Sequence, residues 1–265
     1  MIEVIMPRRN RRRVSMPFRY TYTPDFPTWA HAPAPSVFSG DPAGNWELRI
    51  YGAGTLAVRN RADVEVFAVG PGGAAVGAPI EGAPVSNVYG MGGGGAGYTQ
   101  LAAATLAPGR TYTMTVGRSG AYAADRTEMS ASGTAIITAQ AGMSGGASLE
   151  ETHGGWGGSG GAAMFVYGTQ AAVSASGGSD GANGTAYITP GGSGANYGHG
   201  QGTTTRAFGE AAGALFATGG DTAYLQSVSR QPSAWGDGGA VEYVNGGFVY
   251  HDPWPGLIII RNARG

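Results

Sequence analysis

The stretch Gly90-Met91-Gly92-Gly93-Gly94-Gly95-Ala96-Gly97 determines how the rest of this sequence is interpreted. It runs directly into Tyr98-Thr99-Gln100-Leu101, a segment of β character. Glycine occupies 50 of the 265 positions, whereas an average protein contains roughly 7 % glycine. Further glycine clusters lie at residues 154–161, 177–184, 191–202 and 236–239. The backbone of such a chain is either loose or packed unusually closely.

The composition favours a folded chain over a disordered one. Aromatic residues reach 10 %, charged residues only 12 %, and the net charge is −1. Disorder is typical of chains with low hydrophobicity and high net charge, and this sequence has neither property. The near-neutral balance also indicates that the chain as a whole is not built to bind polyanions.

Alternating apolar residues predict β-strands along the whole chain. Residues 46–51, 64–69 and 111–117 alternate as half-buried strands do. In the third segment, Tyr112, Met114 and Val116 share one face and three threonines share the other. The closing run 257–260 is continuously apolar, which is typical of a strand buried on both faces. Shorter strands are expected at residues 55–58, 134–139, 163–167, 186–189 and 214–218.

The glycine clusters predict a second kind of structure beside the strands. Glycine-rich segments can adopt the polyproline II conformation, with three residues per turn, and can then pack backbone against backbone. Flexible loops are the alternative. Packed layers are favoured because large side chains lie in or beside the clusters, namely Trp156, Met164, Tyr197, His199 and Trp235. We therefore predict an all-β fold: a glycine-rich, β-sandwich-like domain with packed polyproline-II-type glycine segments.

Residues 1–45 differ in character from residues 46–265, which we predict to form the glycine-rich β domain. A basic run is followed by a segment rich in aromatic residues and proline, and neither has a helical period. We expect an extended attachment arm that docks into an acidic groove of a neighbouring protein, because rings and prolines suit protein packing better than phosphate contact. Nucleic acid is the less favoured partner. The arm residues are Arg8, Arg9, Arg11, Arg12, Arg13, Phe18, Tyr20, Tyr22 and Trp29.

Several absences limit the function. The sequence contains no cysteine and therefore has no disulfide or thiolate chemistry. No run of residues reaches the roughly 18 apolar residues of a membrane span, so we expect no membrane insertion. Residues 1–6 do not form the apolar core of a signal peptide.

The motifs that suggest chemistry lack the context that the chemistry needs. Residues 90–95 match a dinucleotide-binding G-x-G-x-x-G, but a β segment follows where a helix must begin. Residues 157–161 match the nucleophile motif G-x-S-x-G without the strand–turn–helix context. The three histidines His153, His199 and His251 are too scattered to indicate a metal site. We expect no catalytic residues, no metal and no cofactor.

The order of the segments resembles the glycine-rich domains of bacteriophage tail-fibre and tail-tip proteins. The resemblance covers roughly residues 46–265 and is carried by an ordered set of pieces: residues 46–50, 64–73, 92–99, 108–117 and 256–261. It implies a virion protein of the phage tail that acts outside the cell. Loops at the distal end of related tail-tip adhesins bind outer-membrane proteins or surface sugars, so the resemblance implies a bacterial surface protein or glycan as partner. The arm at residues 1–45 lies outside the resemblance, and we expect it to dock onto other tail proteins.

Aromatic residues near the glycine clusters are the predicted receptor-binding residues, because exposed rings anchor contacts at small entropy cost. We single out Trp156, Tyr197, His199 and Trp235. The resulting hypothesis is a non-catalytic tail fibre or tail-tip protein that recognises a bacterial receptor. A purely structural tail, baseplate or head-fibre component is one alternative, and a secreted glycine-rich adhesin or ice-binding protein is another. The sequence leaves open whether the chain forms a homotrimer.

Overall fold

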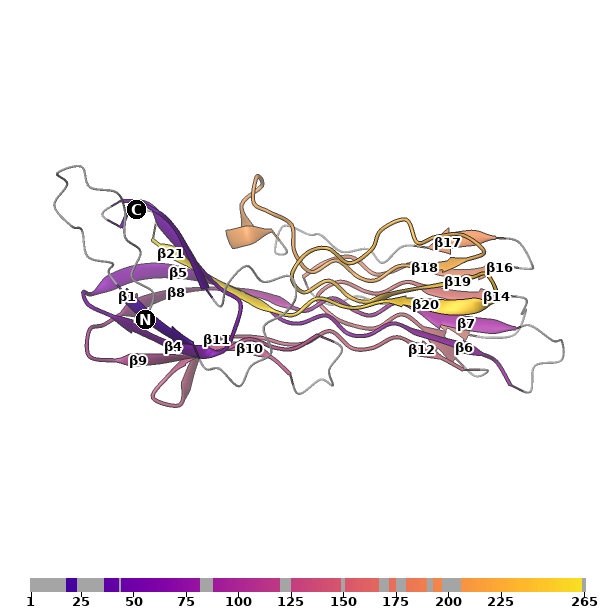
Figure 1. Ribbon diagram of the computed structural model, residues 1–265, viewed down its shortest axis with the longest axis horizontal. Helices are drawn as coiled ribbons and strands as arrows, with labels where there is room; N and C mark the ends of the chain where they lie inside the picture. The colour runs from indigo at the N-terminus through magenta and orange to yellow at the C-terminus, as the bar shows by residue number, and fades with distance from the viewer. Residues whose placement is uncertain are drawn as a thin grey trace.

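The computed structural model describes residues 18–22, 36–42, 44–81, 88–119, 125–148, 151–166, 172–174, 180–189, 193–196 and 206–263. The all-β prediction is confirmed: strands make up 48 % of the structure, and no helix of seven or more residues occurs in the described part. The molecule is elongated, with a β-sandwich at one end, parallel runs of extended chain in the middle and short sheets at the other end (Figure 1). We call these parts the sandwich, the shaft and the distal end.

The sandwich consists of two antiparallel five-stranded sheets. The first sheet contains, in spatial order, β1 (Phe18–Tyr22), β4 (Gly54–Val58), β9 (Thr111–Thr115), β10 (Thr127–Ala131) and β11 (Thr134–Ala139). The second sheet contains β2 (Ser36–Gly40), β3 (Trp46–Ile50), β21 (Leu257–Asn262), β5 (Ala62–Val69) and β8 (Thr99–Leu106). Between the sheets lies the main core, with Tyr112 and Met114 almost fully buried. The predicted inward face of the strand at residues 111–117 is therefore confirmed.

Two strands of the sandwich come from the predicted attachment arm. β1 is an edge strand hydrogen-bonded to β4, and β2 is an edge strand hydrogen-bonded to β3. Phe38 of β2 also packs against Trp46, with ring centroids 6.3 Å apart. These two segments thus belong to the sheets of the domain, although the division at residue 45 stays a prediction. Arg8, Arg9, Arg11, Arg12, Arg13 and Trp29 lie outside the described residues, as do the side chains of Phe18, Tyr20 and Tyr22.

The last strand, β21, is buried on both faces, as its unbroken apolar run predicts. Ile258 and Ile260 point into the main core. Leu257 and Ile259 belong to a second apolar cluster on the outer side of the same sheet. The outer cluster exists because a strap, residues 206–217, covers that side of the sheet.

The strap is held by aromatic packing and by one arginine. The rings of Phe208 and Phe216 lie 5.7 and 5.8 Å from the ring of Phe67 in β5. The Arg261 guanidinium sits 3.7 Å above the Phe208 ring and forms ion pairs with Glu210 (2.8 Å) and Glu65 (2.7 Å). Burial alone lowers the pKa of Arg261, but the hydrogen bonds to Glu210 and Glu65 outweigh this effect, so its pKa is raised.

The predicted strand at residues 214–218 is wrong. This segment forms only one isolated bridge, between Leu215 and Arg206, and otherwise belongs to the strap. Ala217 has a positive φ of 57°, which an extended strand cannot contain. The apolar residues that suggested a strand instead place Phe216 and Ala217 in the outer cluster.

The shaft is held together by hydrogen bonds between backbones that are not part of any sheet. Residues 93–98 lie at its centre, and each of their amides donates to a neighbouring segment over 2.8–2.9 Å. The acceptors of the six amides are the carbonyls of Ala162, Gly239, Met143, Ser159, Gly236 and Gln140, in that order. Residues three apart therefore donate to the same neighbouring segment. A polyproline II helix also has three residues per turn. The polyproline II conformation of the glycine segments stays a prediction.

The carbonyls of the same central segment accept from three further stretches of chain. Gly93 and Ala96 accept from the amides of Gly155 and Gly158, Gly94 accepts from Gly220, and Gly95 and Tyr98 accept from Gly73 and Gly70. The central segment is thus bonded on all sides. Buried backbone polar groups need such partners, and here neighbouring backbones supply them.

Side chains would block this arrangement. A Cβ added at Gly94 would collide with the backbone of Gly73 and Gly239. Equivalent additions at Gly93 and Gly95 would strike backbone atoms of Gly220 and Trp156. Ala96, the one residue of 93–97 with a side chain, places its methyl group in the outer apolar cluster. The glycines of the shaft are therefore required by close backbone approach.

Three short sheets complete the distal end. One contains β16 (Ala186–Thr189), β14 (Ala163–Val166), β7 (Tyr89–Gly92) and β6 (Val76–Pro79). A second contains β17 (Gly194–Asn196), β18 (Thr222–Tyr224), β19 (Ala240–Val244) and β20 (Gly247–His251). The third contains β12 (Gly146–Ala147), β13 (Glu151–His153) and β15 (Ala172–Ser174). Sequence patterns predicted β14 and β16, and β7 extends from Tyr89 into the glycine stretch at residues 90–97.

Replacing Gly94 with alanine tests the close backbone packing. We expect Gly94→Ala to lower the free energy of unfolding by about 3 kcal/mol, because the atoms that the new methyl group meets are backbone and cannot rotate away. Denaturant unfolding followed by circular dichroism measures the change. Gly247→Ala is the control, since a Cβ at Gly247 meets open space, and we expect a change within about 0.5 kcal/mol. Equal losses in both variants would contradict the packing argument.

Candidate functional site

Large apolar side chains reach solvent mainly at the distal end. Among the described residues, nine large hydrophobic side chains are exposed, and five of them lie in or directly after distal strands. These five are Tyr187 and Ile188 of β16, Leu225 after β18, and Val249 and Tyr250 of β20. The other four are Leu101, Met143, Trp156 and Leu215. Exposed apolar patches are typical of interaction sites, so the distal end is the strongest candidate.

A cluster of aromatic rings lies between strands of the same distal end. Tyr89 of β7 packs on Tyr243 of β19 with ring centroids 4.3 Å apart, and their hydroxyls lie 3.0 Å from each other. Tyr224 of β18 stacks on Tyr243 at 5.5 Å, and Phe248 of β20 meets the same ring edge-on at 5.0 Å. We call Tyr89, Tyr224, Tyr243, Phe248 and Tyr250 the distal aromatic cluster. It joins strands from two different sheets.

The β19–β20 hairpin positions two of these rings opposite each other. Asn245 and Gly246 form its turn, both with positive φ (52° and 83°), as a tight hairpin of this type requires. The resulting register pairs Tyr243 with Phe248 across the strands. The dipeptide Asn-Gly between alternating apolar residues is a signal for such a hairpin. The hairpin was not among the predicted elements.

The outer part of the distal aromatic cluster is available to a partner. Tyr224 is buried, Tyr89, Tyr243 and Phe248 are half-buried, and Tyr250 is 51 % exposed. The Tyr250 hydroxyl donates to the carbonyl of Gly77 over 2.8 Å, which fixes the ring at the surface. A fixed ring loses little conformational entropy when it binds. The arrangement therefore suits recognition of a surface.

A buried carboxylate next to the distal aromatic cluster contacts other groups of the protein. Glu242 of β19 is buried and accepts from the amide of Val228 over 2.7 Å. Its other oxygen lies 3.6 Å from the Nε2 atom of His251. These contacts hold the segment after β18 against β19.

The four predicted receptor-binding residues are not brought together in the described structure. Trp156 is 48 % exposed on the shaft and stacks on His153 with centroids 6.1 Å apart. Trp235 is half-buried between Tyr51 (4.8 Å) and Trp254 (5.3 Å) beside the outer cluster. Tyr197 and His199 lie outside the described residues. The binding roles of all four stay predictions, and packing contacts alone account for the position of Trp235.

The motif G-x-S-x-G at residues 157–161 lies inside the shaft. Ser159 is fully buried, and its carbonyl accepts from the central amide of Ala96. A substrate cannot reach a hydroxyl in that position. In the described part of the chain, no group of three histidine, aspartate or glutamate side chains is placed to hold a metal ion. No helix among these residues has the length and hydropathy to cross a membrane.

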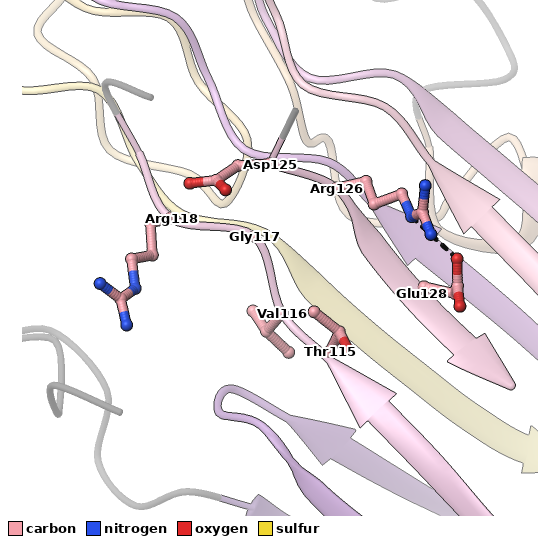
Figure 2. Close-up of a pocket in the computed structure, with 7 residues that line it drawn as sticks. All are labelled: Thr115, Val116, Gly117, Arg118, Asp125, Arg126 and Glu128. Carbon is pink, nitrogen blue, oxygen red and sulfur yellow. Dashed lines mark ion pairs between the residues drawn. The ribbon is translucent and has the colours of Figure 1, made fainter. Parts of the chain in front are cut away.

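One cavity lies at the junction between β9 and β10 (Figure 2). It encloses about 470 Å³ and is lined by Thr115, Val116, Gly117, Arg118, Asp125, Arg126 and Glu128. Arg126 and Glu128 form an ion pair of 2.9 Å across its wall (Figure 2). Residues 120–124, which connect the two walls, lie outside the described residues, and we assign no function to this cavity.

Comparison with protein-family models, with curated proteins and with solved structures gives no match to this chain.

Two substitutions separate rings that hold the distal end from rings that are only displayed. We expect Tyr243→Ala to reduce the free energy of unfolding by about 2 kcal/mol or more, because it removes several ring contacts and a hydroxyl contact. Tyr187→Ala removes a ring that is 46 % exposed, and we expect a change within about 0.5 kcal/mol. Thermal unfolding of both variants measures the difference. A larger loss for Tyr187→Ala than for Tyr243→Ala would refute this division.

Proposed function

We propose that this chain is a phage tail-fibre or tail-tip protein that binds a receptor on the bacterial surface without catalysis. The observation that carries the proposal is the gathering of exposed aromatic and apolar side chains at the distal end, away from the sandwich. The distal aromatic cluster supplies a rigid base for that surface. The resemblance of residues 46–265 to glycine-rich tail-tip domains supports the same conclusion.

The elongated shape allows one end to attach the protein while the other end contacts the receptor. The first and last described strands, β1 and β21, both lie in the sandwich (Figure 1). A carrier joined to either strand is attached at that end, and the distal end then faces outward. Several copies on one particle would convert modest single-site affinity into firm attachment.

The alternatives predict different locations and binding behaviour. A structural tail, baseplate or head-fibre component has the same fold but is enclosed by other proteins. A secreted adhesin or ice-binding protein works without a particle. Immunogold labelling of phage particles separates these cases: label at the far tip supports the proposal, whereas label within a ring or absence of label supports an alternative.

Direct binding to cells is the first test. Purified fluorescent protein is incubated with a panel of bacterial strains, and bound cells are counted with and without excess unlabelled protein. We expect strain-specific binding that the unlabelled protein competes away. If a multivalent form binds no strain, the structural alternative is favoured.

A paired substitution then tests the distal surface. We expect Tyr187→Ala combined with Tyr250→Ala to weaken binding to a susceptible strain by about tenfold or more, because exposed aromatic anchors dominate interfaces. The matched control combines Leu101→Ala with Leu215→Ala, which removes two exposed side chains outside the distal strands. Flow cytometry measures binding after thermal unfolding has shown that both variants are folded. If the two pairs lose binding equally, the distal surface is not the receptor site.

A further inference from the structure

Four exposed arginines gather at the sandwich end of the molecule. Arg19 lies in β1, Arg59 and Arg61 lie in the turn between β4 and β5, and Arg110 directly precedes β9. Strand pairing brings them together: Arg19 is opposite Ala57 of β4, and Ala57 is opposite Thr111 of β9. Neighbouring strands are about 4.8 Å apart, so segments distant in sequence form one basic surface. We call these four residues the arginine patch.

The arginine patch differs from the other described arginines in having no partner within the described chain. Every other described arginine has a partner. Four of them form ion pairs: Arg49 with Glu47, Arg126 with Glu128, Arg230 with Asp237, and Arg261 with Glu65 and Glu210. Arg206 donates to the carbonyl of Gly213, and Arg118 also interacts with another group. Among the described arginines, those without a partner thus lie at one end of the molecule.

A short stretch of sequence connects the basic run to β1. Phe18, the first residue of β1, is opposite Val58, one residue before Arg59. Four residues lie between Arg13 and Phe18 in the sequence. The basic run at residues 8–13 is thus close in sequence to Arg19 of the patch.

We propose that the arginine patch docks this chain onto a carboxylate-rich surface of another protein. Guanidinium groups bind carboxylates in a bidentate manner and are lightly hydrated. Asp41 and Asp63 are exposed at the same end, on the second sheet, so the end carries both signs of charge side by side. A protein surface can match that pattern. Such a surface can also carry basic groups that face the two aspartates, which the uniformly charged backbone of a nucleic acid lacks.

The test uses the full chain and two polyanions as probes. Binding to poly-L-glutamate and to double-stranded DNA of equal total charge is measured by biolayer interferometry at fixed salt. We expect the variant Arg59→Gln, Arg61→Gln, Arg110→Gln to bind poly-L-glutamate about tenfold more weakly than the unchanged chain, since exposed pairs are each worth a few-fold at most. The control, Arg118→Gln with Arg126→Gln, should change binding less than the triple variant.

A residue-level measurement keeps the basic run from obscuring the result. Modification of arginine by phenylglyoxal, read by mass spectrometry, is compared with and without poly-L-glutamate. We expect protection of Arg59, Arg61 and Arg110 and none of Arg118. Absence of protection at the patch, or triple-variant binding equal to that of the unchanged chain, would overturn the proposal. Tighter binding of DNA that depends on the same three arginines would replace the protein partner with a nucleic acid.

Discussion

The direct bonding of backbone to backbone in the shaft is the constraint on which the rest of the structure depends. The amides of residues 93–98 donate in turn to three neighbouring segments, and the same order of segments repeats after three residues. Such close approach leaves no room for a Cβ at positions such as Gly94. Because buried amides and carbonyls must be paired, losing one neighbour leaves groups on several segments unsatisfied. The shaft segments therefore stabilise one another and connect the sandwich to the distal sheets.

Because the shaft is mostly glycine, most side-chain packing occurs at the two ends. The sandwich has an ordinary apolar core and a second cluster under the strap, where Phe208 and Phe216 cover Phe67. The distal end has few residues per strand and depends on ring contacts such as that between Tyr89 and Tyr243. Between them the shaft offers mostly glycine. This distribution is why we propose that one end attaches the protein and the other end contacts a partner.

The sequence predicted the fold better than the site. Alternation located the inward face of residues 111–117, and the apolar run at 257–260 predicted burial on both faces, because both patterns are local. The segment at 214–218 was misassigned, since nothing in its composition shows that Ala217 takes a positive φ. The distal aromatic cluster was not predicted as a site because its rings come from residues 89, 224, 243, 248 and 250. Strand pairing brings the last four together, and packing between two sheets adds Tyr89. Trp235 was chosen for its neighbouring glycines, yet it packs between Tyr51 and Trp254.

The bonding pattern of the shaft also has a mechanical consequence. Its hydrogen bonds join neighbouring segments sideways, for example from Gly94 to Gly239 and from Gly97 to Gly236, while the segments themselves run along the long axis (Figure 1). A pull on the distal end loads these bonds in shear, so many must break together before the segments slide. The same pull is shared among several covalent strands of one polypeptide. A rod of this kind transmits tension from one end to the other with little stretch.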